Sequence, residues 1–186
     1  MDDTQVLFVI ASQEFNEIEY SIPKKLITDA GFTVITASNR SDEAIAKDGS
    51  ITHVDITLDK VIASNYLGIF FIGGAGAIEH LDNQTSYKII QQALQHNLCI
   101  GAICIATRIL ANAHALTNKS ATGWDGDDQL ANIYKEHHVL YTKQPVVVDD
   151  NIITAIGPSA AEEFGKKIIE ILQKKTKLGI KLCGGE

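Results

Sequence analysis

Three continuous apolar runs constrain the fold of this chain more than any other feature. They read QVLFVIA at 5–11, GIFFIGG at 68–74 and LCIGAI at 98–103. None of them alternates apolar with polar residues, which is typical of strands that other elements cover on both faces. Such strands belong to parallel sheets, whose neighbouring strands are usually connected by a helix. The runs therefore predict an α/β protein.

The segments around these runs have the spacing of helices and further strands. Apolar residues recur at helical spacing in the first segment, which Gly31 ends: they are Ile18, Ile22, Leu26 and Ile27. Helices are also expected at 86–97, 125–137 and 159–175, and strands at 32–38 and 139–142. The stretch VVVDDNIITAI, 146–156, predicts an antiparallel hairpin through Asp150 and Asn151. Together they predict a flavodoxin-like, doubly wound, mostly parallel sheet sandwiched by helices, with one small antiparallel hairpin.

The size and composition of the chain fit one domain. It has 186 residues, of which 45% are hydrophobic and 21% charged, as in ordinary globular domains. The last helical pattern ends at 175, and the remaining stretch, TKLGIKLCGGE, is basic and then glycine-rich. We therefore expect a single domain over 1–175 and a flexible C-terminal tail over 176–186.

The charge of the chain limits its partners. Its formal net charge of −7, with dispersed Lys and Arg, argues against a nucleic-acid partner. The N-terminal stretch MDDTQVLFVIAS is acidic where a secretory signal would be basic, and no apolar segment has the ~18 residues of a bilayer span. We therefore expect a cytoplasmic protein without a membrane partner.

The three cysteines cannot all pair with one another, and none has zinc-ligand spacing. Neither a disulfide framework nor a metal site is predicted. Cys99 lies within an apolar strand, where a structural role is expected. Cys183 in the tail is expected to be exposed and incidental.

Cys104 stands where an apolar strand ends and a helical segment begins. Small neighbours, Gly101, Ala102 and Ala106, permit the sharp bend of a nucleophile elbow. A following helix and the N–H of Ile105 would favour the thiolate and a developing oxyanion, so a lowered thiol pKa is expected. The alternative interpretation, a buried cysteine that acts as a small hydrophobe, stays open from this segment alone.

Two further segments make the chain resemble the ThiJ/PfpI superfamily, which contains the Parkinson-disease-associated deglycase and the PfpI-type intracellular proteases. The segment EFNEIEYSIPKKLITDAGFTV resembles the first helix of that family, with its E-x-x-x-P element at Glu19 to Pro23. FFIGGAGA, 70–77, is similar to its glycine turn, and GAICIATRILA, 101–111, to its cysteine elbow. The similarity extends over about 5–173.

The resemblance implies a role for several residues. Cys104 would be the nucleophile and Glu19 its proton donor, with a pKa raised by a partly dry pocket. The N–H groups of Gly74 and Ile105 would form the oxyanion site. Pocket walls would come from the glycine turn and the single tryptophan: Gly73, Ala75 and Trp124. Each role has an alternative. Glu19 could be a solvent-exposed helix residue, the glycines could form only a tight turn, and Trp124 could pack in the core.

The chain lacks the histidine that many relatives carry after the cysteine or about twenty residues later. Ile105 follows the cysteine, and Gly123 and Trp124 stand at the later place. A Cys–His dyad is not supported, so protease activity is not expected. His80 is the best placed substitute among the six histidines, and Asp125 and Asp127 are expected to cap a helix.

Two functions from different classes follow. The first is a cysteine-dependent enzyme, glyoxalase-like or deglycase-like, that acts on small reactive carbonyls through Cys104 and Glu19 without any cofactor. The second is a redox-sensing or protective protein whose Cys104 reacts with an oxidant. A class I glutamine amidotransferase-like hydrolase shares the elbow but needs an H-x-E element that is absent here. The resemblance also implies a homodimer.

Overall fold

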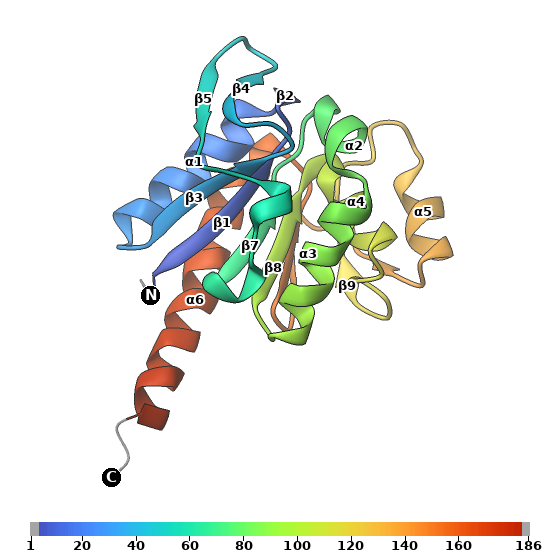
Figure 1. Cartoon of the computed structure of the whole chain (residues 1–186). Coiled ribbons are helices and arrows are strands. Elements are labelled where there is room, and N and C mark those ends of the chain that lie inside the picture. The colour runs from blue at the N-terminus through green and yellow to red at the C-terminus, as the bar shows by residue number, and fades with distance from the viewer. Residues whose placement is uncertain (1–3, 184–186) are drawn as a thin grey trace.

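The computed structural model of the protein describes residues 4–183, with side chains through 176. Its centre is a seven-stranded sheet (Figure 1). In spatial order the strands are β11 (Val146–Asp149), β12 (Ile152–Ala155), β8 (Cys99–Ile103), β7 (Gly68–Phe71), β1 (Gln5–Ile10), β3 (Thr33–Ser38) and β6 (Ile56–Thr57). Only β11 is antiparallel to its neighbour in this sheet. The predicted flavodoxin-like sheet with one antiparallel hairpin is confirmed.

Helices cover both faces of the sheet. One face carries α1 (Glu17–Asp29) and α6 (Ala161–Cys183), and the other carries α2 (Ala75–Leu81), α3 (Gln84–Gln95) and α4 (Thr107–Asn112). A short pair of strands, β9 (Ser120–Ala121) and β10 (Leu140–Tyr141), accompanies α5 (Leu130–Glu136) at one side of the molecule. Within residues 4–183, no helix combines the length and apolarity that crossing a membrane requires.

The apolar runs are buried on both faces, as their composition predicts. In β1, Leu7 and Val9 join the core beneath α3 and α4, whereas Phe8 and Ile10 join the core beneath α1 and α6. All four side chains are completely buried. A polar residue at any of these places would be buried without a partner, which explains why the runs do not alternate.

The strand order predicts where a ligand would bind. From β1 the chain first adds β3 and β6 on one side, and later β7, β8 and β12 on the other. The order therefore reverses between β1 and β7, and ligands of such sheets bind beyond the carboxyl ends of the strands at this point.

A second, three-stranded sheet lies at this end of the molecule and was not predicted. It consists of β2 (Gln13–Phe15), β4 (Asp42–Ala46) and β5 (Ile51–Val54), and its hairpin extends at the top of Figure 1. Charged residues and alanines dominate β4, and both have low strand propensity. The sequence pattern therefore does not predict this hairpin. The hairpin places Lys47 beside the crevice.

Two helix predictions need correction. In α1, Ile18 and Ile22 are 47% and 38% exposed, so they do not lie on the buried face of the helix. The buried residues there are Glu19, Tyr20, Pro23 and Ile27, because the face that packs against the sheet includes the glutamate.

Helix α5 begins at Leu130 rather than at 125. The Asp125 carboxylate accepts the Leu130 N–H at 2.8 Å and holds the preceding residues in a turn.

The C-terminal helix is longer than predicted. α6 continues to Cys183, eight residues beyond the helix end predicted at 175. The flexibility of 176–186 stays a prediction. The segment contains no proline, and paired glycines follow only after Cys183. The remaining tail residues, 184–186, lie outside the described part of the chain, as does the side chain of Cys183.

Gly76 at the start of α2 should tolerate no side chain. A Cβ there would lie 1.8 Å from the carbonyl oxygen of Gln13, a backbone atom that cannot move freely. We expect Gly76→Ala to lower the free energy of unfolding by about 3 kcal/mol, measured by urea denaturation. Gly49→Ala is the control, because Gly49 has a φ of 87° but open space, and should cost about 1 kcal/mol. Equal losses would contradict this account.

Candidate active site

Cys104 occupies a strained bend directly after β8. Its φ is 63°, a value that residues other than glycine rarely adopt. A 3-10 turn, Cys104–Ala106, follows and leads into α4. The carbonyl oxygen of Cys104 accepts hydrogen bonds from the Thr107 hydroxyl at 3.0 Å and from the Trp124 N–H at 3.3 Å. These bonds hold the bend in place, and the predicted elbow is present.

Glu19 reaches the cysteine from α1. The side chain of Asn16 caps this helix by accepting the Glu19 N–H at 3.3 Å. The Glu19 side chain is completely buried, and its Oε2 accepts the Gly73 N–H at 3.0 Å. Among the described residues, no N–H or O–H group donates to Oε1, although the Cys104 side chain is in hydrogen-bond contact with the carboxyl group. A buried oxygen without a donor favours a proton at that position.

Gly73 makes this contact sterically possible. A Cβ at this residue would lie 2.6 Å from the Cys104 Cβ and 2.6 Å from Glu19 Oε2. A side chain would therefore separate the carboxyl group from the thiol. Gly73 is itself buried beneath the pocket and does not line it.

Burial raises the pKa of Glu19 to about 7, although hydrogen bonds with Cys104 and the Gly73 N–H oppose this rise. The carboxyl group is therefore partly protonated at neutral pH. This agrees with the proton-donor role that the family resemblance implies for Glu19.

Burial and the negative charge of Glu19 raise the pKa of the Cys104 thiol to about 12, while the N–H groups of Ile105 and Gly74 lower it in part. The expected lowered thiol pKa is therefore wrong while Glu19 is ionised. When Glu19 is protonated its charge vanishes, and its O–H can donate to the sulfur, which favours the thiolate. The two titrations are therefore coupled, because ionisation of Glu19 near pH 7 makes the Cys104 thiol harder to deprotonate.

A cavity of about 310 Å³ opens above the sulfur. Of the residues predicted from sequence, Gly74, Ala75, Ile105 and Trp124 line it together with Cys104. Three further lining residues were missed: Asn16, Lys47 and Pro158. Asn16 and Pro158 precede and begin helical turns, where sequence alone indicates only capping.

The other candidate residues lie elsewhere. None of the residues that line this cavity is a histidine, His80 included. Asp125 caps the turn before α5, and Asp127 pairs with Arg108. Cys99 is completely buried, and burial raises the pKa of its thiol to about 12, as expected for a structural cysteine. Across residues 4–183, no cluster of three or more His, Cys, Asp or Glu side chains is suited to holding a metal ion.

Comparison with known proteins identifies the family. The family model described as DJ-1/PfpI family matches residues 4–171. The chain belongs to the DJ-1/PfpI family. An uncharacterised protein of Methanocaldococcus jannaschii is 30% identical over 175 residues, which are 94% of this chain and 85% of that protein. An uncharacterised protein of Archaeoglobus fulgidus is 28% identical over 170 residues, covering 90% of this chain and 98% of the relative.

Solved structures of DJ-1/PfpI proteins share the fold. A ThiJ/PfpI domain protein from Brachyspira murdochii superposes with a TM-score of 0.88 at 25% identity, covering 94% of this chain and 99% of that one. DJ-1beta from Drosophila melanogaster superposes with a TM-score of 0.81 at 26% identity, covering 97% and 98% of the two chains. The resemblance inferred from the elbow, the glutamate and the glycine turn is therefore confirmed at the level of the family.

Arg108 holds the Trp124 wall of the DJ-1/PfpI pocket in place. Its guanidinium donates to both carboxylate oxygens of Asp127, at 2.6 and 3.0 Å, and lies 5.4 Å from the centre of the Trp124 ring. The hydrogen bonds from Arg108 lower the pKa of Asp127, which keeps this carboxylate ionised. The ion pair therefore connects the loop that carries Trp124 to α4.

Loss of this ion pair should loosen the tryptophan. Asp127→Asn removes the ion pair, so opening of the loop that carries Trp124 should become more frequent. Because Trp124 is the only tryptophan, its fluorescence reports this directly: we expect a red shift and stronger acrylamide quenching. Asp128→Asn, at a neighbouring exposed residue, is the control. Identical spectra for Asp127→Asn and wild type would contradict the role of Arg108.

Proposed function

We propose that this protein is a cysteine-dependent enzyme that acts on small reactive carbonyls in a glyoxalase-like or deglycase-like reaction. The observation that carries the proposal is the contact between the Cys104 side chain and the buried, partly protonated carboxyl group of Glu19. The cavity above the sulfur, about 310 Å³, lies at the small end of the roughly 300–1,000 Å³ of ligand sites. A small aldehyde suits it better than a peptide.

The proposed reaction with methylglyoxal begins with addition. The Cys104 thiolate attacks the aldehyde carbon, the carbonyl electron pair moves to oxygen, and Glu19 gives its proton to that oxygen to form a hemithioacetal. The N–H groups of Ile105 and Gly74, which hydrogen-bond the sulfur, are near the developing oxyanion.

An internal oxidation and reduction follows. The ionised Glu19 removes the proton from the former aldehyde carbon, giving an enediolate. It returns this proton to the neighbouring carbon, while the hydroxyl proton of the hemithioacetal moves to the oxygen of that neighbouring carbon. The first carbon is thereby oxidised to a thioester and the second reduced to an alcohol. Water hydrolyses the thioester, which releases lactate and restores the thiol. No external oxidant, metal or organic cofactor enters this balance.

The direct test is production of lactate from methylglyoxal by the purified protein without added thiol or metal. We expect lactate to accumulate beyond one equivalent per chain, detected by an enzymatic or chromatographic assay. Consumption of a single equivalent without lactate would contradict turnover and would indicate trapping of the aldehyde on the thiol.

A redox function without turnover is the second candidate, and the absence of histidine from the cavity lining favours it. The thiolate would attack peroxide to give a sulfenic acid and water, and a second peroxide would give a sulfinic acid and water. Intact and peptide masses after mild peroxide treatment should then show two added oxygens on Cys104 and none on the buried Cys99. Equal oxidation of both cysteines would contradict a tuned site.

We also propose a cytoplasmic homodimer. A reducing compartment keeps a reactive thiol available, and the family resemblance implies a dimer. The exposed side chains of Ile18 and Ile22 share one face of α1 and support burial of this face by a second copy. Analytical ultracentrifugation should give twice the chain mass of 20.2 kDa, whereas a monomer at micromolar concentration would contradict the proposal.

A further inference from the structure

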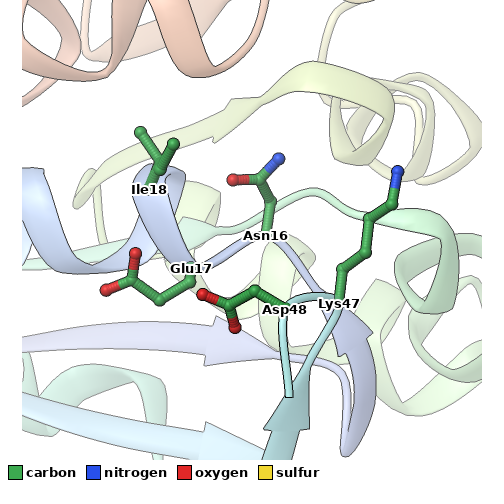
Figure 2. Close-up of a pocket in the computed structure, with 5 residues that line it drawn as sticks. All are labelled: Asn16, Glu17, Ile18, Lys47 and Asp48. Carbon is green, nitrogen blue, oxygen red and sulfur yellow. The ribbon is translucent and has the colours of Figure 1, made fainter. Parts of the chain in front are cut away.

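Lys47 and Asn16 line two neighbouring hollows. Both residues border the cavity above Cys104, and both also border a second cavity of about 300 Å³ that Glu17, Ile18 and Asp48 complete. Figure 2 shows the second cavity, with the nitrogen ends of Asn16 and Lys47 pointing the same way and the carboxylates of Glu17 and Asp48 lying together apart from them. The two nitrogen-bearing side chains therefore stand at the boundary of the Cys104 cavity.

The positive charge of Lys47 has no partner within the described part of the chain. Lys47 is exposed, and none of the ion pairs among these residues includes it. The adjacent Asp48 is engaged elsewhere, because its Oδ1 accepts the N–H and the hydroxyl of Ser50, at 3.0 and 2.6 Å. A free ammonium group therefore faces the crevice.

Backbone hydrogen bonds hold Lys47 at the edge of the pocket. The N–H of Lys47 donates to the carbonyl oxygen of Phe15 at 2.9 Å, which ties the end of β4 to the residue just before Asn16. The N–H of Asn16 in turn donates to the carbonyl oxygen of Gly73 at 2.9 Å, directly below the pocket. Lys47 is thus connected to the glycine turn by two successive backbone hydrogen bonds.

Asn16 adds a neutral donor beside the charge. Its Oδ1 accepts the N–H of Glu19, so its amide nitrogen points away from the helix and has no acceptor among the described residues. The remaining cavity walls are apolar or backbone, including Ala75, Ile105 and Trp124. Among the described residues, Lys47 is therefore the only Lys, Arg, Asp or Glu that lines the cavity above Cys104.

We propose that Lys47, assisted by Asn16, binds a carboxylate group of the substrate, so that the site selects carbonyl compounds that carry a carboxylate over neutral ones. Lys47 is a specificity-determining residue in this proposal, and it does not touch the reacting sulfur. A carboxylate in a partly enclosed cavity gains more from an ammonium group than it does in bulk water. The identity of the substrate class rests on the proposed function, but the preference of the cavity for an anion does not.

Alkylation of Cys104 measures this preference without turnover. Iodoacetate and iodoacetamide have similar size, both lose iodide to the thiolate, and only the first carries a carboxylate. The ratio of their second-order rates at Cys104, followed by peptide mass spectrometry, cancels any change in thiol reactivity. We expect this ratio to fall about five-fold in Lys47→Gln and to be kept in Lys47→Arg. Lys88→Gln, which removes an equal charge from the exposed surface of α3, should leave it unchanged.

The outcomes separate this proposal from the proposed function. A fallen ratio in Lys47→Gln supports anion selection even if the wild-type protein makes no lactate, in which case the proposed function alone fails. An unchanged alkylation ratio, or an equal fall in Lys88→Gln, would overturn the role of Lys47.

Discussion

Replacing Cys104 by serine is expected to reduce lactate formation from methylglyoxal by more than about 10³-fold, because it removes the proposed nucleophile. A serine hydroxyl is far less acidic than a thiol, and the site offers Glu19 but no histidine to activate it. The variant should keep the fold, since the hydroxyl is smaller than the thiol and sits at the edge of a cavity. The measurement is the initial rate of lactate formation at saturating methylglyoxal.

Cys99→Ala is the matched control for this prediction. Cys99 is a completely buried cysteine on the preceding strand, so its loss should cost stability but not activity. We expect wild-type turnover per folded molecule. Full activity in Cys104→Ser, or equal losses in the two variants, would exclude covalent catalysis by Cys104.

Glu19→Gln is expected to stabilise the protein at alkaline pH. The folded pKa of Glu19, about 7, lies above its ordinary value of 4.5, so folding favours the protonated form. The favourable contribution is complete below the unfolded pKa and is lost as the pH rises through the folded pKa. At 1.36 kcal/mol per pKa unit the difference corresponds to roughly 3 kcal/mol. Glutamine has the size of the protonated acid and cannot ionise.

The measurement is urea unfolding of wild type and Glu19→Gln at pH 4.5 and pH 8. The variant should match wild type at the acidic pH and exceed it by up to about 3 kcal/mol at the alkaline one. Glu17→Gln, at the half-buried first residue of the same helix, should show no such difference. A constant difference between wild type and Glu19→Gln at both pH values would mean that Glu19 titrates normally.

The same substitution should harm the proposed activity. Glutamine can donate a hydrogen bond but cannot give or take a proton, so turnover of methylglyoxal should fall by about 10²–10⁴-fold. If Glu19→Gln makes the protein more stable but less active, the protein retains Glu19 for its chemistry rather than for stability. A Glu19→Gln variant with wild-type turnover would remove Glu19 from the proposed proton transfers.

The sheet and the elbow could be predicted from sequence because each depends on local composition. Residues 6–11, which include Phe8 and Val9, contain no polar side chain, as is typical of a strand covered on both faces. Cys104 could be placed because small residues surround it where such a strand ends. These features depend on neighbours along the chain.

The remaining features depend on neighbours in space. Glu19 faces the core while Ile18 is half exposed, because packing of α1 against the sheet and α6 overrides the apolar pattern of the helix. Lys47 reaches the pocket from a hairpin with weak strand propensity. The thiol pKa could not be judged from a bend alone, because burial and the charge of Glu19 act against the backbone N–H groups.

The pH dependence of Cys104 alkylation by iodoacetamide tests most directly whether the Glu19 carboxyl group acts on the Cys104 thiol. Above pH 7 wild-type Glu19 is mostly ionised, and its negative charge raises the pKa of the thiol. Glu19→Gln removes this charge, so we expect the apparent pKa of Cys104 to fall and the alkylation rate at pH 9 to exceed that of wild type. Identical pH profiles for wild type and Glu19→Gln would contradict the contact between the two side chains.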